Sequence, residues 1–167
     1  MRRDMKNPRS HLGDIITIES PLHAKVVSLE TVADPVFSGK MMGEGVALVP
    51  VDGVLTSPVD GIIETIADTA HAVGLRSDNG VEILIHLGLD TVKLNGKHFI
   101  ARVAEGDRIN KGDILIHFDP EGIRNAGYNP ITPFTVINSS DFESVLPAGS
   151  DHVLPGEPLL LLQVKDK

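Results

Sequence analysis

Short runs of aliphatic and β-branched residues, each interrupted by Gly, Pro or Asp, recur along the chain and constrain its fold more than any other feature. Runs of this length and spacing are typical of strands in an all-β sandwich or barrel. The sustained period of 3.6 residues that the helices of a doubly wound α/β fold require is absent. The sequence therefore predicts an antiparallel all-β fold, with strands expected at residues 15–18, 25–29, 46–49, 61–66, 81–87, 98–103, 113–118, 134–138 and 158–164.

Helices are expected to be short and few. Residues 35–43 predict a loop or short helix lying over the sheet. Residues 121–127 and 140–145 predict two further short helices, the second of them capped by Ser140 or Asp141.

Two pairs of segments resemble each other. EILIHLG at 82–88 is similar to DILIHFD at 113–119, and SPVDG at 57–61 is similar to part of AEGDRINKGD at 104–113. Each pair combines a strand, a glycine turn and a returning strand. We interpret them as a duplicated β motif within a sandwich or barrel-like fold.

The length of 167 residues fits one domain with a real core, and we assign residues 14–167 to it. Residues 1–13 hold four basic side chains against one carboxylate and are interpreted as a flexible polar tail. The net charge of −8 argues against nucleic acid as a partner. Neither a signal peptide nor an apolar run long enough to span a membrane is visible, so we expect a cytoplasmic protein.

A candidate site lies in the stretch 69–92, TAHAVGLRSDNGVEILIHLGLDTV. Its Asp-Asn-Gly sequence at 78–80 predicts a turn that joins two strands as a hairpin. Val, Ile and Leu alternate with other residues after the turn, which places the aliphatic side chains on one face and His86 on the other. His71 and His86 are at similar distances from the turn, so we expect the hairpin to bring their imidazoles together.

Histidine is the best candidate for chemistry in this chain. Cysteine is absent, and neither a Gly-x-Ser-x-Gly nor a phosphate-binding GxxxxGK[ST] motif occurs. His117 shares the ILIH context of His86, but it is followed by Phe-Asp-Pro and has no second histidine across a predicted hairpin. We interpret the remaining histidines as surface residues: His11, His23, His98 and His152.

Five segments together resemble the IIA component of the glucose family of the bacterial phosphoenolpyruvate-dependent sugar phosphotransferase system. They are FSGKMMGEGVAL, SPVDGIIETI, DTAHAVGLRSDNGVEILIHLGLDTVKLNGKHF, VAEGDRINKGDILIHFD and TPFTVIN. They occur in the family's order and cover the chain from about residue 14 onward. The resemblance implies an antiparallel β-sandwich that carries a phosphoryl group on a histidine.

The resemblance also implies roles for single residues. His86 would accept the phosphoryl group from phospho-HPr and pass it to a cysteine on a IIB domain, and His71 would hydrogen-bond the phosphate. Thr69 would support His71, Asp34 and Asp90 would flank the site, and a carbonyl near Gly88 would fix the ring of His86. No cofactor is required. Metabolic enzymes or transporters regulated by docking are further partners that the family suggests.

The docking surface of such a carrier is expected to be apolar, because it must fit several partners. The candidates are Phe37, Met41, Met42, Ile66 and Leu84. Ala67, Ala70 and Leu84 stand where the better-known family members have larger, more polar or aromatic residues. These departures leave both histidines in place and affect the expected preference for partners.

Three other readings stay open. A biotinyl or lipoyl carrier domain would explain 103–115, but Lys40-Met41-Met42 is not in a clean hairpin. A zinc-binding β-sandwich hydrolase would use His71 and His86, although a catalytic site needs a third protein ligand; zinc could also bind between them opportunistically. A purely structural β domain gives no reason for the 69–92 stretch.

Overall fold

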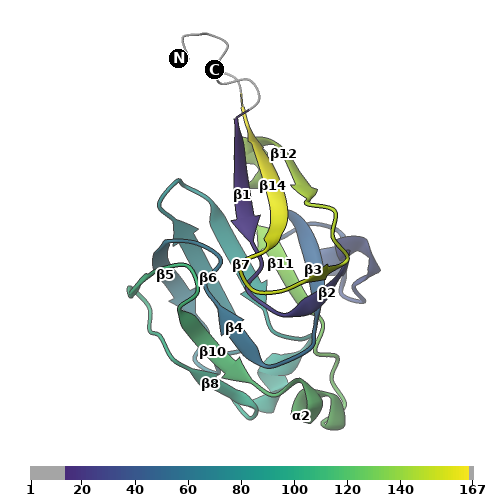
Figure 1. Cartoon of the computed structure of the whole chain (residues 1–167). Helices are drawn as coiled ribbons and strands as arrows, with labels where there is room; N and C mark the ends of the chain where they lie inside the picture. Colours follow the sequence, from purple (N-terminus) through teal and green to yellow (C-terminus); the bar gives the residue numbers. More distant parts are fainter. Residues whose placement is uncertain (1–13, 166–167) are drawn as a thin grey trace.

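The computed structural model describes residues 14–165, so the predicted tail at 1–13 lies outside the described residues. The predicted all-β fold is confirmed: within this range the chain forms strands joined by short loops, with two short α-helices (Figure 1). The strands are β1 (Ile15–Glu19), β2 (Ala24–Ser28), β3 (Glu44–Pro50), β4 (Val54–Thr56), β5 (Gly61–Ile66), β6 (Ala72–Ser77), β7 (Glu82–His86), β8 (Phe99–Ala101), β9 (Arg108–Ile109), β10 (Ile114–Phe118), β11 (Thr132–Val136), β12 (Phe142–Pro147), β13 (His152–Val153) and β14 (Pro158–Val164). The α-helices are α1 (Pro35–Ser38) and α2 (Pro120–Asn125), and the 3-10 helices are η1 (Leu29–Thr31), η2 (Thr91–Leu94) and η3 (Ser139–Asp141).

Three antiparallel sheets make up the sandwich. The largest has eight strands in the order β13-β2-β3-β11-β7-β6-β5-β9, and two three-stranded sheets have the orders β4-β10-β8 and β1-β14-β12. β11 lies between β3 and β7 and is buried along its whole length. The strand that carries His86 is therefore held near the middle of the largest sheet.

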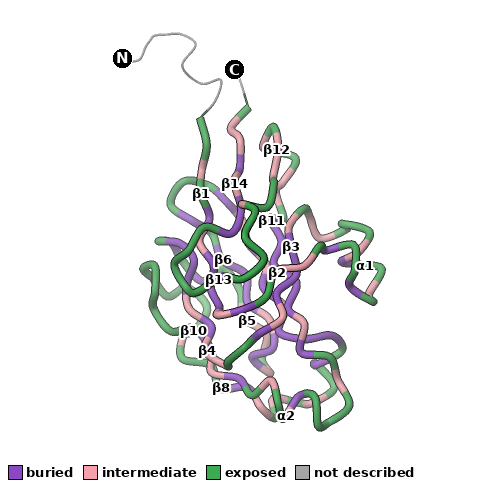
Figure 2. The backbone as a smooth tube through the Cα atoms, turned by 45° about the vertical axis from the view of Figure 1, so that its right-hand side comes forward, coloured by how far each residue is buried: buried purple, intermediate pink, exposed green. Residues whose placement is uncertain are grey.

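The main core lies between the large sheet and the two smaller ones. It joins aliphatic side chains of all three sheets, among them Ile83 and Ile85 of β7, Leu115 of β10 and Leu160 of β14. Figure 2 shows the buried segments concentrated in the central strands, while the loops at the periphery are exposed. The predicted inward face of β7 is confirmed, because Val81, Ile83, Ile85 and Leu87 are fully buried.

A second, smaller apolar cluster lies on the other face of the large sheet. It consists of Leu29, Val32, Phe37, Ala47 and Leu89, with Val27, Met42, Leu84 and Ile131 packed against it. The segment that contains η1 and α1 covers the sheet here. Asp34 begins α1, because its carboxylate accepts a hydrogen bond from the backbone N–H of Val36 at 3.0 Å.

The helix predicted at 140–145 is wrong. η3 ends at Asp141, and residues 142–147 form β12, which pairs with β14 from Phe142 to Pro147. Ser140 and Asp141, which suggested a helix cap, are the last two residues of a single 3-10 turn. Pairing with the long aliphatic strand β14 outweighs a local cap here. The short helices expected within 35–43 and 121–127 are present as α1 and α2.

The two ends of the described chain meet at one end of the molecule. β1 and β14 lie side by side, and the N–H of Val164 donates to the carbonyl of Asp14 at 3.0 Å (Figure 1). Between residues 14 and 165, no helix has the length and hydropathy that a membrane crossing requires.

Candidate functional site

The predicted hairpin brings His71 and His86 together. β6 pairs with β7 in a register that places Ala72 opposite His86, and the N–H of Leu87 donates to the carbonyl of His71 at 2.7 Å. The two imidazole centroids are 5.2 Å apart, with their planes at 78°. The predicted convergence of the two rings is confirmed, and both can contact one small group between them.

The ring of His86 is fixed by a backbone carbonyl. Its Nδ1 lies 2.6 Å from the oxygen of Gly88. A carbonyl oxygen only accepts hydrogen bonds, so Nδ1 carries the proton and Nε2 keeps its lone pair. Gly88 adopts a φ of +88°, and a Cβ there would lie 2.6 Å from Cγ2 of Thr91, so this position requires glycine.

His71 is held by a side chain instead. The hydroxyl oxygen of Thr69 lies 2.7 Å from Nδ1 of His71. When this hydroxyl donates, Nε2 of His71 carries the ring proton and becomes a donor. His71 is more enclosed than expected for a residue outside the core: it is 8% exposed, and the ring of Phe99 lies 6.5 Å from its ring.

Burial keeps both imidazoles neutral. Burial lowers the pKa of His86 below its ordinary value, although the hydrogen bond to Gly88 and the charges of Asp34 and Asp90 oppose this shift. Burial also lowers the pKa of His71, and the neighbouring His86 adds to the effect. At neutral pH the site therefore presents one nucleophilic nitrogen on His86 beside a second neutral ring.

Two carboxylates flank the histidines, as expected from the resemblance. Asp34 stands at the beginning of α1, where its side chain is partly occupied in capping the helix. Asp90 lies in the loop after β7 with a φ of +59°, and its side chain makes no capping hydrogen bond to η2. Neither carboxylate is hydrogen-bonded to an imidazole within the described part of the chain; they act on His86 through their charge.

The five candidates for an apolar docking surface differ in exposure. Met41 is 75% exposed, and Met42, Ile66 and Leu84 are partly exposed. Phe37 was expected on this surface, which is wrong, because it is 5% exposed. Its ring packs against His86 with a centroid separation of 5.4 Å and belongs to the second apolar cluster.

Two other histidines of the described range, His117 and His98, have their contacts in other parts of the fold. His117 is on β10, in a different sheet, opposite Ile100 of β8 and Val54 of β4. His98 is less exposed than expected, with 19% of its side chain accessible, and its Nδ1 lies 3.8 Å from the carboxylate of Asp119. In the range 14–165, no group of three or more His, Cys, Asp and Glu side chains is placed to hold a metal ion.

Two residues near His86 are not singled out by the sequence analysis. Thr91 donates from its hydroxyl to the carbonyl of Leu87 at 2.7 Å, and the carbonyl of Asn129 accepts from the N–H of Leu89 at 3.0 Å. The Asn129-Pro130 pair is a recognisable turn signal. Its contact with the loop after β7 comes from the tertiary fold and leaves no local pattern.

Known proteins resemble this chain over most of its length. Residues 16–142 match the family described as phosphoenolpyruvate-dependent sugar phosphotransferase system, EIIA 1. The glucose-specific EIIA component of Bacillus cereus is 50% identical over 129 residues, which cover 77% of this chain and 78% of that protein. The beta-glucoside-specific EIIBCA component of Bacillus subtilis is 45% identical over 157 residues, or 94% of this chain.

The chain spans only 26% of the length of that Bacillus subtilis relative. Among solved structures, glucose permease IIA from Mycoplasma capricolum superimposes with a TM-score of 0.79 and 29% sequence identity, covering 89% of this chain and 96% of that one. The matched sequence and the shared fold lead to one conclusion: the chain belongs to the EIIA 1 family of the phosphoenolpyruvate-dependent sugar phosphotransferase system.

Proposed function

We propose that this chain is a single IIA domain that carries phosphoryl groups in sugar uptake, accepting them on His86 from phospho-HPr and passing them to a IIB domain. The observation that carries the proposal is the 2.6 Å contact between Nδ1 of His86 and the carbonyl of Gly88. It leaves Nε2 as the nucleophile, and the lowered pKa keeps that nitrogen unprotonated at neutral pH.

In the accepting step, the lone pair of Nε2 attacks phosphorus in line with the donor. A bond forms between Nε2 and phosphorus while the bond from phosphorus to the donor breaks, and its electron pair stays with the donor. The proton on Nδ1 remains in its hydrogen bond to Gly88, whose oxygen stabilises the positive charge that the ring acquires. No general base is needed, because Nε2 has no proton to lose.

His71 serves the phosphoryl group once it is attached. Its Nε2–H donates to a phosphoryl oxygen, provided that the hydroxyl of Thr69 donates to Nδ1 and so fixes the tautomer. The phosphoryl group brings a charge of roughly −2 next to Asp34 and Asp90. These carboxylates repel it, which weakens ground-state binding and favours onward transfer.

HPr and the IIB domain dock on the apolar surface around Met41, Met42, Ile66 and Leu84. The name EIIBCA of the Bacillus subtilis relative supports a IIB domain as the receiving partner. We place the reaction in the cytoplasm, with docked metabolic enzymes or transporters as further partners and no nucleic acid. The transfer requires no cofactor, and a zinc ion bound opportunistically by His71 and His86 would block the nucleophile.

The test is incubation with phosphoenolpyruvate, enzyme I and HPr, followed by intact mass spectrometry and an acid-lability assay. His86→Gln should abolish phosphorylation, because it removes the nucleophile. His71→Gln should still be phosphorylated but should transfer to IIB more slowly. His117→Gln is the matched control and should behave as wild type. Phosphorylation of His86→Gln, or its loss in His117→Gln, would place the acceptor elsewhere.

A further inference from the structure

The peptide between Gly88 and Leu89 is held from both sides. Its carbonyl accepts from Nδ1 of His86 at 2.6 Å, and its N–H donates to the carbonyl of Asn129 at 3.0 Å. In a trans peptide the C=O and N–H point in opposite directions, so Asn129 on one side aims the carbonyl at His86 on the other. The three groups form one chain of hydrogen bonds, in which each bond polarises the next.

Thr91 fixes the same loop through its buried side chain. Its side chain is fully buried, and its hydroxyl donates to the carbonyl of Leu87 at 2.7 Å. A Cβ added to Gly88 would lie only 2.6 Å from the methyl carbon of Thr91, so the methyl group fills that space. Leu87 is in turn tied through its N–H to His71. Thr91 therefore sets the path of the backbone immediately before the carbonyl that holds His86.

The direction of the Asn129 carbonyl is set by the turn that Asn129 begins. Its side-chain oxygen accepts from the N–H of Ile131 at 2.9 Å, across Pro130. This is the side-chain-to-backbone turn that asparagine favours, and proline restricts the backbone inside it. The hydroxyl of Thr132 donates to the carbonyl of Pro130 at 3.0 Å and connects the turn to β11. The carbonyl of Asn129 is thereby fixed relative to the central strand of the large sheet.

We propose that Thr91 and Asn129 are positioning residues for His86. They hold the Gly88–Leu89 peptide so that its carbonyl keeps the ring proton on Nδ1 and leaves the lone pair on Nε2. The tautomer of a histidine is set by the hydrogen bond that its other nitrogen makes, so a small rotation of this peptide releases the ring. The role in transfer rests on the proposed function of His86, whereas the tautomer itself does not.

The direct test is ¹⁵N NMR of the ring nitrogens of His86 in the unphosphorylated protein. Wild type should show a protonated Nδ1 and an unprotonated Nε2. Thr91→Val keeps the shape but removes the donor, and Asn129→Ala removes the turn. In both, the ratio of the two tautomers should shift by roughly tenfold toward Nε2–H, the factor that corresponds to one ordinary hydrogen bond. Thr91→Ser keeps the hydroxyl and should restore most of the wild-type signature.

The matched control is Thr135→Val, on β11. Thr135 is also fully buried, but in residues 14–165 its hydroxyl has no hydrogen-bond partner. The tautomer of His86 should be unchanged in this variant. The proposal is overturned if Thr91→Val keeps the wild-type tautomer, or if Thr135→Val shifts it equally. Asn129 is exposed, so its variant supplies the same test if Thr91→Val does not fold.

A kinetic arm separates this inference from the proposed function. The kcat for phosphorylation of Thr91→Val by phospho-HPr should fall in the same proportion as the fraction of His86 that NMR finds in the Nδ1–H tautomer. KM should be unchanged, because buried Thr91 cannot touch a partner. If wild type is not phosphorylated but the tautomer shifts as expected, the positioning role stands and the carrier function fails. A tautomer that does not respond overturns the positioning role even in an active carrier.

Discussion

Replacing Phe37 with alanine should weaken both the fold and the environment of His86. Phe37 joins the two, because its buried ring is part of the second apolar cluster and contacts the imidazole at 5.4 Å between centroids. Burial is the largest cause of the lowered pKa of His86. Removing the ring admits water to one side of the imidazole, so the pKa of His86 should rise toward its ordinary value.

The stability loss follows from the size of the cluster. Phenylalanine-to-alanine changes in protein cores cost about 3–5 kcal/mol, and the cost falls where the surroundings can collapse. α1 has only four residues and can settle into the space that the ring leaves, so the lower figure applies. A loss of about 3 kcal/mol corresponds to a fall in Tm of roughly 6–12 °C for a chain of this size.

Thermal unfolding followed by circular dichroism and an NMR titration of His86 measure the two effects. Met41→Ala is the control, because Met41 is 75% exposed on the same segment and should change the free energy of unfolding by less than about 0.5 kcal/mol. The reasoning fails if Phe37→Ala loses less than about 1 kcal/mol, the average cost of a point mutation, and leaves the pKa of His86 unchanged.

Three further changes test other parts of the structure. Gly88→Ala should destabilise the fold more than Gly112→Ala in urea unfolding, because both glycines have a φ of +88° but a Cβ meets close atoms only at Gly88; equal losses would show that the contact with Thr91 has no weight. Thr135→Val should raise the free energy of unfolding by about 1 kcal/mol, since it removes a buried hydroxyl without a partner in the described range; a loss of stability would reveal a partner. Finally, the unfolded chain binds protons to His71 and His86 more readily than the folded one, so stability should fall as the pH drops below about 6.5. His71→Gln should reduce this dependence in denaturation series at several pH values, and an unchanged dependence would contradict the lowered pKa of His71.

The hairpin could be predicted from the sequence because its determinants are local. The turn residues at 78–80 and the alternation after them fix the register of β6 and β7, and the register alone brings His71 and His86 together. Gly88 also has a local signal, because a glycine two residues after His86 lets the backbone come close. Asp34 came only from the resemblance, since no local pattern ties it to His86.

The remaining features depend on packing between distant segments. Phe37 was expected on an apolar docking surface, and only its packing in the second apolar cluster explains its burial. β9 and β13 have two residues each, too few for any periodic signal. Residues 142–147 became a strand because β14 offers them a partner. Asn129 reaches the loop after His86 only once β11 is in place.

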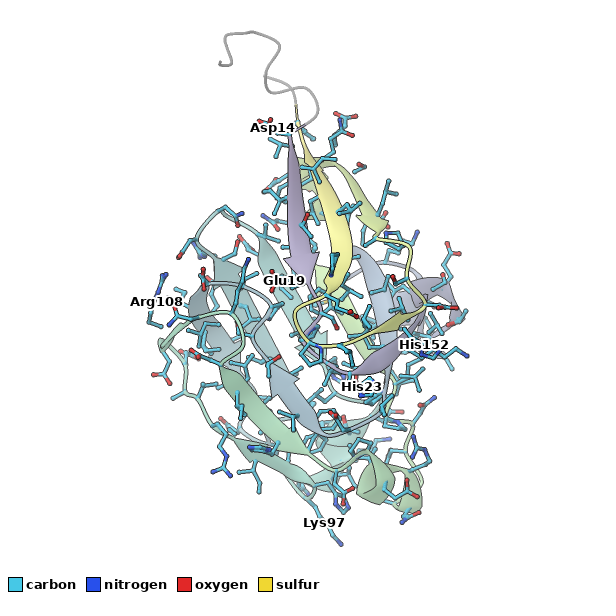
Figure 3. All side chains as sticks on the ribbon, in the orientation of Figure 1. Asp14, Glu19, His23, Lys97, Arg108 and His152 are labelled. Atoms are coloured by element: carbon cyan, nitrogen blue, oxygen red, sulfur yellow. The ribbon has the colours of Figure 1, made fainter. Side chains whose placement is uncertain are left out.

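The two ends of the described chain lie side by side, which affects how a second domain could be attached to this one. The turn that joins β6 to β7 lines a cleft with Ile16 and Ile18 of β1, so the imidazoles stand at the opposite end of that hairpin. Figure 3 shows Asp14 and Lys97, which follows η2, at opposite extremes of the molecule. A linker attached before β1 or after β14 would therefore leave from the same spot and would not crowd the histidines. The length of such a linker would set how often the site meets a partner domain on the same chain. It would matter little whether that partner domain is fused before β1 or after β14.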